Sequence, residues 1–342
     1  MKKHPIKFND KKCLRLSFFY LFEQRIFLHL FFKFHSRYCH NKGLNLYSAF
    51  YEEAKMYQIL QEKTEVNILK QIKPFHGKLD QILQFKPKIR FLLSKAGFTV
   101  KTAENPYEFQ EVLKLRHRVF YEELLHKNQE NGLDMDEFDF ICDHLIVIDE
   151  KENRIIGTYR LNSSLFTDYF YSETEFDIKN LKKLPGTKLE LGRACIEADY
   201  RNGLTITLLW AGLSEYIKKI NARYLFGCSS VKTVDTFQIG TVFQFLKERY
   251  YSDVSLRVYP IGKFKIGNIS SYADFISNVT RSYDPKTAKK LVPSLLNSYL
   301  KAGAFICGEP ALDKDFQCID FLTLLDTSSM KETVIKKFDL GS

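Results

Sequence analysis

The sequence lacks the residue patterns of common metal and redox sites. Its seven cysteines are scattered without a CxxC pair, and all eight histidines lie at or before His144. Zinc sites need closely spaced cysteine and histidine ligands, so we expect no metal. An odd number of cysteines spread through apolar runs is typical of reduced, buried thiols in a cytosolic protein. A catalytic Cys–His pair would have to form across the fold, and no local pattern indicates one.

Two further patterns are missing. The sequence contains neither the G-x-x-x-x-G-K-[ST] phosphate loop nor the glycine fingerprint of dinucleotide-binding folds. It has no uninterrupted long apolar run, because Arg15, Glu23, Arg25 and Lys33 lie within residues 14–34, its most apolar segment. No small-residue cleavage site follows that segment. These absences argue against a nucleotide-binding loop, a transmembrane helix and a cleavable signal.

Positive charge is confined to the N-terminal part of the chain. The 342 residues are 45% hydrophobic and 27% charged, which suits one large or two modest globular domains. Residues 1–95 contain 19 Lys and Arg against 7 Asp and Glu, whereas the remainder contains 32 against 34. A basic segment predicts an anionic partner, either lipid or nucleic acid, although a solvated tail has the same composition. We therefore treat residues 1–95 as a basic, aromatic-rich extension.

The apolar segment of this extension has the pattern of an amphipathic helix. At about 100° per residue, Arg15, Arg25, His29 and Lys33 fall within a sector of roughly 80°, and the rest of the wheel is largely Phe, Leu and Ile. Such a helix lies on an anionic leaflet, which predicts a cytoplasmic protein attached to the inner face of the membrane. The Phe-rich face suits lipid better than nucleic acid, which we do not expect as a partner. Alternatively, the helix packs on the folded domain, or the extension has no function.

From about residue 96 the pattern changes to alternating helices and strands. Asn105 and Pro106 form a helix start, with Asn as the cap and Pro at the first helical position. A domain over residues 96–330 with one mixed central sheet is therefore expected, of the α/β or α+β class, followed by a tail at 331–342. The elements that we expect are a hairpin at 144–150 and 154–161, strands at 188–196, 222–231, 304–310 and 318–326, and helices at 205–220, 233–247 and 285–303.

The stretch KLELGRACIEADYRNG, residues 188–203, carries charges within an apolar strand. Burying a charge costs free energy unless the charge is paired or faces a site, so the presence of Glu190 and Arg193 in this strand requires an explanation. Strand side chains alternate between faces, and residues three apart should point in opposite directions. Gly192 is a natural place for a β-bulge, which would turn one charge to the face of the other. We predict a bulge here and both charges in one polar cluster.

The turn that follows this strand has the pattern of an anion site. Arg201, Asn202 and Gly203 open the helix expected at 205–220. A glycine turn at a helix start offers free backbone N–H groups and the positive end of the helix dipole, which bind phosphate. The alternative is an ordinary helix cap.

Several blocks of the second part of the chain resemble, in order, the GNAT acyltransferase superfamily. Within it they are most similar to the ornithine-lipid type N-acyltransferases, often labelled haemolysin-like. The blocks span most of residues 98–326 and leave the N-terminal extension uncovered. The resemblance implies a GNAT-like mixed sheet flanked by helices, with a shortened phosphate loop after its central strand. The blocks are LKLRHRVFYEEL, DEFDFICDHLIVID, IIGTYRL, LELGRACIEADYRNGLTITLLWAGL, RYLFGCSSV and LLNSYLKAGAFICGEPALDKDF.

The same region is similar to the acyl-homoserine-lactone synthases. Those enzymes share a basic-aromatic helix, an acidic D-x-x-D loop and a Glu-x-x-Arg strand, and the long GEPALDKDF region favours the lipid branch. The resemblance implies one catalytic cluster, although a purely structural ion-pair network is the alternative. The residues at the corresponding positions here are Arg118, Asp136, Asp139, Glu190 and Arg193.

The activity that the resemblance implies is N-acyltransfer in bacterial membrane-lipid synthesis. A 3-hydroxylated fatty acyl group would pass from the phosphopantetheine arm of acyl carrier protein to the α-amine of an amino acid, with ornithine as the leading candidate. The product would be a lyso-lipid, and no bound cofactor is implied. The alternatives are another amine acceptor, such as glycine or a homoserine-lactone precursor, and a non-catalytic protein that binds or lyses membranes.

Aminolysis of a thioester assigns provisional roles to individual residues. Glu190 would take the proton of the amine, a contribution on the order of 10²–10⁴ in rate. Backbone N–H groups around Cys195 and Ile196 would hold the oxyanion at a splayed strand. Arg160 would bind the carboxylate of the acceptor or, alternatively, lie on the surface. Acidic residues in the 134–143 loop would receive the ornithine ammonium or form a solvated face.

Overall fold

The computed structural model describes residues 76–129, 131–279 and 283–330. Contacts between Cα atoms divide the chain into Met1–His76 and Gly77–Ser342, and the fold given below is that of the second unit. The predicted amphipathic helix at 14–34 and the tail at 331–342 lie outside the described residues. Among the helices that the structure describes, none has both the length and the hydropathy to cross a bilayer.

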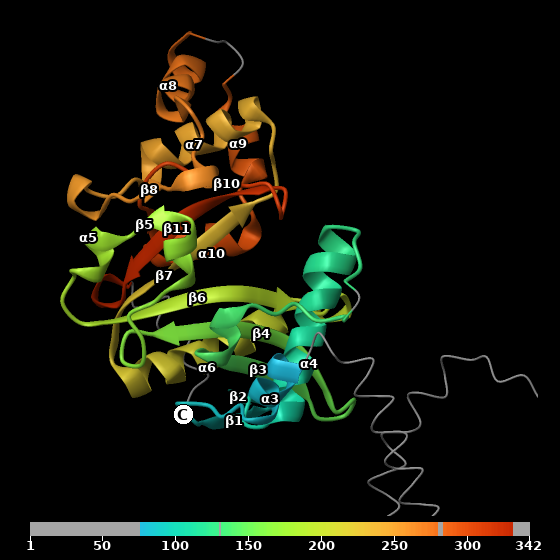
Figure 1. The fold of residues 1–342 in the computed structure, drawn as a ribbon. Coiled ribbons are helices and arrows are strands. Elements are labelled where there is room, and N and C mark those ends of the chain that lie inside the picture. The colour runs from blue at the N-terminus through green and yellow to red at the C-terminus, as the bar shows by residue number, and fades with distance from the viewer. Residues whose placement is uncertain (1–75, 130, 280–282, 331–342) are drawn as a thin grey trace, which may run out of the picture. The chain divides into compact units, whose positions relative to one another are not determined.

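Within the described residues, nine strands form one sheet at the centre of this unit (Figure 1). Their order is β1-β2-β3-β4-β6-β7-β11-β10, and β9 pairs with β11. All neighbours are antiparallel except β6 and β7, which are parallel. The mixed sheet that we predicted is therefore confirmed. The strands are β1 (Leu92–Lys95), β2 (Phe98–Thr102), β3 (Asp143–Asp149), β4 (Arg154–Ser163), β6 (Thr187–Ile196), β7 (Ala222–Val231), β9 (Phe305–Ile306), β10 (Ala311–Asp313) and β11 (Cys318–Asp326).

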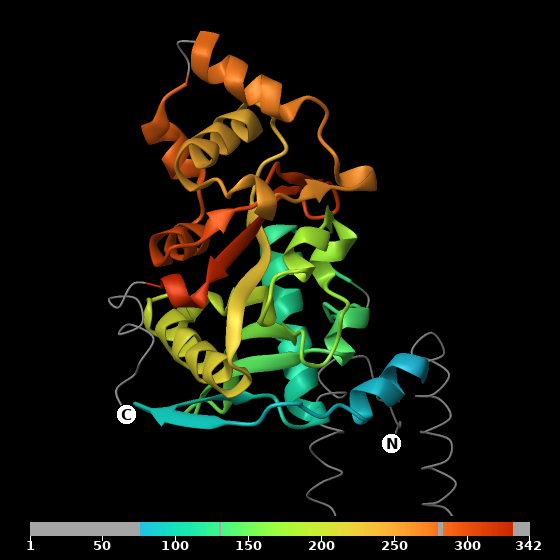
Figure 2. The same ribbon diagram turned by 90° about the vertical axis from the view of Figure 1, so that its left-hand side faces the viewer.

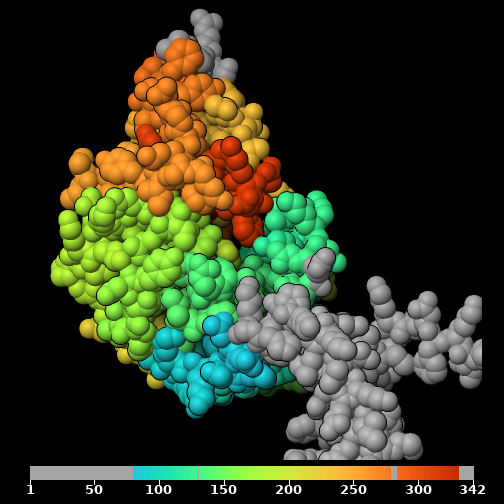
Figure 3. All heavy atoms as spheres, viewed as in Figure 1, coloured from blue at the N-terminus to red at the C-terminus, as the bar shows by residue number. Residues whose placement is uncertain are grey.

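A second, two-stranded sheet joins β5 (Phe176–Asp177) to β8 (Tyr259–Pro260). Segments far apart in the sequence therefore lie side by side, and the space-filling view shows the orange part of the chain that holds β8 against the yellow-green part that holds β5 (Figure 3). This contact matters for the site because Glu175 immediately precedes β5, and its carbonyl accepts the backbone N–H of Ile261.

Each helix that we predicted within the described residues is present, with bounds that differ by at most three residues from those expected, apart from one exception. Asn105 caps α4 by accepting the N–H of Glu108, and Pro106 is its first residue. The chain continues from α4 into a π-helical segment, Arg118–Leu124. The helices are α3 (His76–Leu83), α4 (Pro106–His117), α5 (Lys179–Lys182), α6 (Leu204–Ile220), α7 (Thr236–Tyr250), α8 (Ile269–Val279), α9 (Pro285–Leu291) and α10 (Ser294–Ala302).

The exception is the helix expected at 285–303, which is two helices. α9 ends at Leu291, and α10 begins at Ser294 after Pro293. Proline cannot donate the intrahelical hydrogen bond and its ring clashes with the preceding turn, so it ends one helix and starts the next. The single-helix prediction was wrong because it placed Pro293 in a helix interior.

The boundary that we placed after residue 95 falls in the turn between β1 and β2. Leu92 pairs with Lys101 and Lys95 with Phe98, so both strands belong to the central sheet. The folded unit therefore starts before residue 96, because this hairpin uses residues that we assigned to the extension.

α4 and α6 cover opposite faces of the sheet (Figure 2). The ring of Phe109 in α4 lies 4.9 Å from that of His144 in β3. The next residue, Leu145, belongs to the same hydrophobic core as Leu213 of α6 and Tyr159 of β4. Neighbouring strand side chains point to opposite faces, which places the two helices on either side. The α4 face carries the polar site, and the α6 face carries the apolar core.

Candidate active site

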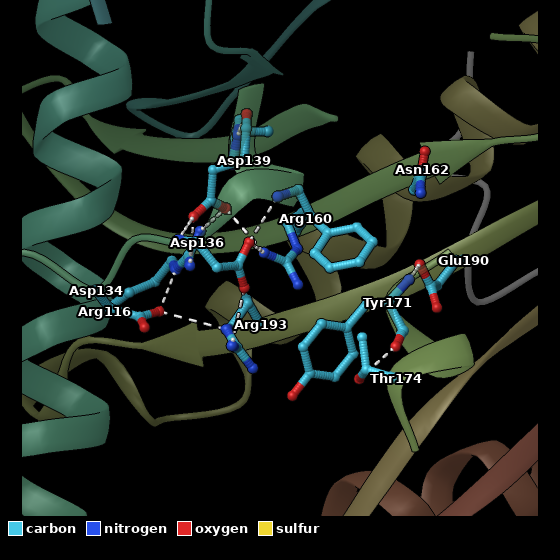
Figure 4. Close-up of polar contacts among 12 residues, drawn as sticks. Arg116, Asp134, Asp136, Asp139, Arg160, Asn162, Tyr171, Thr174, Glu190 and Arg193 are labelled. Atoms are coloured by element: carbon cyan, nitrogen blue, oxygen red, sulfur yellow. Dashed lines mark hydrogen bonds and ion pairs between the residues drawn. The ribbon is translucent and has the colours of Figure 1, made fainter. Parts of the chain in front are cut away.

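Three arginines and three aspartates alternate in a closed ring of ion pairs on the α4 face (Figure 4). Arg116 contacts Asp134 at 2.7 Å and Asp139 at 2.5 Å. Arg160 contacts Asp139 at 3.0 Å and Asp136 at 2.6 Å. Arg193 closes the ring with Asp136 at 3.1 Å and Asp134 at 3.4 Å. We call these six residues the arginine–aspartate ring.

The opposite charges within the ring compensate for the free-energy cost of burying each of its ionised side chains. Neither the Arg116 nor the Asp139 side chain is accessible to solvent. Burial by itself raises the pKa of Asp139, but the charges of Arg116 and Arg160 outweigh burial and hold that pKa well below its usual value. The pKa of Asp134 is also lowered, because the charges of Arg116 and Arg193 outweigh the effect of burial. The carboxylates of Asp134 and Asp139 therefore stay ionised, and the ring contains as many basic as acidic side chains.

The ring corrects two expectations about the 134–143 loop and α4. Its aspartates are neutralised by arginines, so they form neither a solvated face nor a site for an ammonium group. Arg118, which we placed in the cluster, instead pairs with Glu197 at the protein surface, and its side chain is 38% exposed. The buried arginine is Arg116. Helical periodicity could have found it, because Phe109, Val112, Leu113 and Arg116 follow the i, i+3, i+4, i+7 spacing of one buried face.

The bulge predicted in β6 is confirmed, one residue beyond Gly192. Gly192 pairs with Arg160 of β4 and Cys195 with Thr158, so two residues of β6 oppose one of β4. Arg193 is the extra residue, with φ of 49°. The bulge turns Arg193 to the α4 face, where it joins the ring. It also restores the alternation, because Ala194 packs with Leu189 against the α6 core.

Glu190 lies on the same side of the sheet but outside the ring (Figure 4). Its Oε1 accepts the backbone N–H of Ser172 at 2.7 Å and the Ser172 hydroxyl at 2.7 Å, and its Oε2 accepts the N–H of Tyr171 at 2.9 Å. Burial raises the pKa of Glu190, and these hydrogen bonds only partly oppose that effect. The expectation that Glu190 and Arg193 share one bonded cluster is therefore not met, because Tyr171 lies between them.

Beyond Glu190 the parallel strands β6 and β7 separate. Their last paired residues are Glu190 and Phe226. A cavity of about 620 Å³ occupies the gap and is lined by residues of both strands. Consecutive residues 226–230 of β7 line it, and because their side chains alternate between faces, the cavity extends to both sides of the sheet. The splayed strand that we predicted is present.

The hydrogen-bond register identifies which N–H groups face this gap. The N–H of Glu197 donates to the Ile156 carbonyl of β4. In an antiparallel ladder alternate residues point to opposite edges, so the Cys195 N–H faces β4, whereas those of Ala194 and Ile196 face the open edge. The open-edge N–H groups nearest the predicted oxyanion contact are thus those of Ala194 and Ile196, and the contact itself stays a prediction. The Cys195 thiol is no nucleophile either, because burial raises its pKa to about 12.

The turn before α6 contains the glycine conformation that we expected, but its arginine is already paired with a glutamate. Gly203 has φ of 88°, a left-handed conformation that favours glycine, and Asn202 accepts the N–H of Leu204. Arg201 Nη2 donates to Glu123 Oε2 at 2.7 Å. The first hydrogen bond within the helix runs from the Thr207 N–H to the Gly203 carbonyl. Of the preceding N–H groups, that of Leu204 is bonded to Asn202, and those of Thr205 and Ile206 point out of the helix end.

A second group of carboxylates lines the cavity, and sequence reasoning did not identify it. Glu175, Asp313 and Asp320 are buried and come from three separate segments. A signal for one of them existed, since Asp320 is a charged residue inside the apolar strand CIDFLTLLD, the argument that we applied to Glu190. Nothing in the sequence places Glu175 beside it.

Comparison with known proteins agrees with the geometry. Residues 115–211 match the family described as acetyltransferase (GNAT) domain. L-ornithine N(alpha)-acyltransferase of Rhizobium meliloti (strain 1021) is 31% identical over 248 residues, which are 67% of this chain and 80% of that protein. The enzyme of the same name from Rhodobacter capsulatus is 28% identical over 69% of this chain and 92% of its own.

Among solved structures, a CoA-dependent acyl-homoserine lactone synthase, BjaI, matches 68% of this chain and 78% of its own at 14% identity, with a TM-score of 0.37. The match to the Rhizobium meliloti enzyme is the one that decides the family, because it combines 31% identity with most of that protein's length. The family predicted from the sequence is confirmed: the chain is an acyltransferase and belongs to the L-ornithine N(alpha)-acyltransferase family.

Proposed function

We propose that this protein transfers a 3-hydroxy fatty acyl group from the phosphopantetheine thioester of acyl carrier protein to the α-amine of ornithine. The product is a lyso-ornithine lipid, which a second acyltransferase completes. The acceptor is the one for which the similar curated enzymes are named. The structural observation that carries the proposal is the cavity between β6 and β7, which joins an apolar compartment to an acidic one.

The apolar compartment suits the acyl chain. On the α6 face the cavity is lined mostly by uncharged side chains of α6, α10 and β11, and the exposed Lys218 is the charged residue on this side. Apolar surface of this kind binds a hydrocarbon chain by excluding water from both. Residues of this compartment are Trp210, Leu213, Ile217, Leu225, Tyr299, Ala302 and Leu325.

The open edge of β6 suits the thioester carbonyl. The N–H groups of Ala194 and Ile196 would donate to the oxygen as negative charge develops on it. The α-amine attacks the carbonyl carbon, the C–N bond forms, and the C–S bond breaks to release the pantetheine thiolate. Glu190 is our candidate for the group that accepts the proton of the attacking amine, directly or through water, because it lines the cavity and burial raises its pKa.

The arginine–aspartate ring would position the acceptor. Arg160 and Arg193 both line the cavity. Arg160 donates to Asp136 and Asp139 through Nη1, and its remaining donors would bind the α-carboxylate of the acceptor. The aspartates hold the two guanidinium groups in place, and in this role Asp136 and Asp139 are positioning residues.

The donor would enter past the first turn of α6. The outward N–H groups of that turn suit the phosphate of the phosphopantetheine arm. Arg201 reaches Glu123, and Lys232 donates to the carbonyl of Leu124, whose side chain lines the cavity. These two cations therefore flank the same approach and would attract the anionic carrier protein. The basic extension would hold the enzyme at the anionic inner leaflet, where the lipid product is needed.

Lipid mass spectrometry on bacteria expressing the full chain tests the proposal. We expect a new N-acyl ornithine species that is absent with Glu190→Ala, and its mass gives the acceptor and the acyl chain. Purified protein with 3-hydroxyacyl-acyl carrier protein and L-ornithine should give the same product. A folded protein that forms no N-acyl amino acid in either experiment would contradict the proposed function.

A further inference from the structure

The acidic compartment of the cavity holds three buried carboxyl groups without a basic partner in the part of the chain that the structure describes. Glu175, Asp313 and Asp320 are 1%, 6% and 3% exposed, and all three line the cavity. Across the described residues, no ion pair within 4.0 Å connects any of them to Lys, Arg or His. This contrasts with the arginine–aspartate ring, where each carboxylate meets two arginines.

The hydrogen bonds of this compartment leave one acceptor unused. Asp320 Oδ1 accepts the Ser230 hydroxyl at 2.6 Å, and Asp313 Oδ1 accepts the N–H groups of Asp315 and Phe316. Glu175 Oε2 is buried without any hydrogen-bond partner. A buried carboxylate oxygen in that condition is costly, and buried polar groups are normally satisfied. An unpartnered oxygen in the wall of a cavity points to a ligand with donors.

The electrostatics of the three groups point to a cation. Burial, together with the neighbouring Asp320 and Asp313, raises the pKa of Glu175 to about 8. Burial raises that of Asp320 to about 6. A bound cation would supply the missing counter-charge and allow the carboxylates to ionise.

We propose that Glu175, Asp313 and Asp320 form the binding site for the side-chain ammonium group of a diamino acid acceptor. This inference rests on the proposed function, and it names the residues that would select the acceptor in that reaction. An ammonium group has three donors, one for each carboxylate. The site lies next to the candidate base, since the Cys228 thiol, which also lines the cavity, is 3.6 Å from the Ser172 hydroxyl that donates to Glu190. The acceptor would place its α-amine at the open edge of β6 and its second amine among the three acids.

A divalent metal ion is the competing occupant. Ligand atoms of Asp313, Cys318 and Asp320 lie within 4.8 Å of one another. However, burial raises the pKa of the Cys318 thiol, which donates a hydrogen bond to Asp320 Oδ2. A thiol must lose its proton to bind a metal, so this set favours an ammonium group over a metal ion.

Steady-state kinetics with two acceptors distinguish the contribution of the second amine to acceptor binding from that of the carbon chain. L-ornithine and L-norvaline have the same carbon skeleton, and norvaline lacks the second amine. With a fixed acyl thioester donor, we expect wild-type KM for norvaline to exceed that for ornithine. Asp320→Asn and Glu175→Gln should each raise KM for ornithine on the order of 10- to 100-fold, the usual effect of losing a hydrogen bond to a charged group. Their KM for norvaline should change less than about 3-fold.

Asp315→Asn is the matched control. It removes a carboxylate from the same loop, but Asp315 is exposed and pairs with Lys263. Its kinetics with both acceptors should match wild type. Equal KM for both acceptors in wild type, or an equal rise of KM for both in the variants, would overturn the inference. A fall in kcat for both acceptors without a change in KM would also overturn it, because Glu175 would then be a base.

Calorimetry on the full chain keeps the inference testable even without turnover. We expect L-ornithine to bind after EDTA treatment and to bind at least 10-fold more weakly to Asp320→Asn. Ornithine binding that requires added Mn²⁺ or Zn²⁺ would overturn the ammonium site. Ornithine binding by a protein that acylates no amino acid would instead contradict the proposed function and leave the inference standing.

Discussion

Arg116 and Asp139 form a bidentate ion pair in the interior, with Nη1–Oδ1 at 2.5 Å and Nη2–Oδ2 at 3.1 Å. The pair joins the helix on one face of the sheet to the loop that precedes β3. It is one side of the arginine–aspartate ring, so its loss would leave Asp134 and Asp139 buried beside one arginine each.

The first prediction concerns this pair. Arg116→Met should lower the free energy of unfolding by about 3–5 kcal/mol, because removing one partner of a buried ion pair leaves an uncompensated charge. Arg118→Met is the control, since its half-exposed pair with Glu197 should contribute about 0–1 kcal/mol. Urea unfolding of the two variants checks this, and equal effects would refute a buried ring.

The second prediction is a pH dependence. The pKa of Glu175 is raised from 4.5 to about 8 by burial. A raised pKa means that the group contributes fully to stability below about 4.5 and that the contribution is lost as the pH rises to about 8. Glu175→Gln mimics the protonated form, so it should match wild type at pH 4.5 and exceed it by at least about 1 kcal/mol above pH 8. A difference in unfolding free energy that does not vary with pH would contradict the prediction.

The third prediction tests the divergence of β6 and β7. A Cβ atom at Gly227 would lie 2.2 Å from the Leu191 carbonyl oxygen, so Gly227→Ala must push the two strands apart. We expect kcat to fall at least about 10-fold, because misplacing reacting groups by about 1 Å costs roughly 100-fold. Gly267→Ala is the control, as nothing lies within 4 Å of the added atom. Wild-type kcat in Gly227→Ala would show that this approach of the strands is irrelevant to catalysis.

The fourth prediction concerns acyl-chain length. Ser214 of α6 lines the apolar compartment, whereas Glu215 does not. Ser214→Phe should fill part of the cavity and lower kcat/KM for long-chain donors about 10-fold or more relative to short-chain donors. Glu215→Phe adds the same ring outside the cavity and should leave the chain-length profile unchanged. An unchanged profile in Ser214→Phe would place the acyl chain elsewhere.

The fifth prediction addresses the N-terminal extension. The full chain should float with vesicles that contain anionic lipid and not with neutral ones, since basic residues near a surface contribute roughly 1 kcal/mol each. Substituting Glu for Arg15, Arg25 and Lys33 should abolish flotation. The same charge change at exposed Lys286, Lys289 and Lys290 of α9 should preserve it. Equal loss in both triple variants would mean that overall charge, rather than the extension, governs binding.

Local patterns predicted much of this structure. Alternation and turn residues located the β3–β4 hairpin, and the spacing of Glu190 and Arg193 around a glycine located the bulge. The resemblance supplied the family and three ring members, Asp136, Asp139 and Arg193. Prediction succeeded where the deciding interactions lie within a few residues of one another.

Long-range contacts explain what could not be predicted. Arg116 and Arg118 are two residues apart, and only the packing of α4 decides which is buried. Glu175 and Asp320 are 145 positions apart in the sequence, and they meet because β11 lies beside β7 while β5 pairs with β8. No local pattern encodes such a meeting.

The cavity that extends to both sides of the sheet has an evolutionary consequence. Under the proposed function, the residues that bind the acyl chain lie on one face of the sheet, and those that bind the acceptor lie on the other. Few positions contribute to both binding sites. Mutations that alter one preference therefore leave the other intact. A lineage with this architecture can change the fatty acids of its lipid and the head group of its lipid in separate steps.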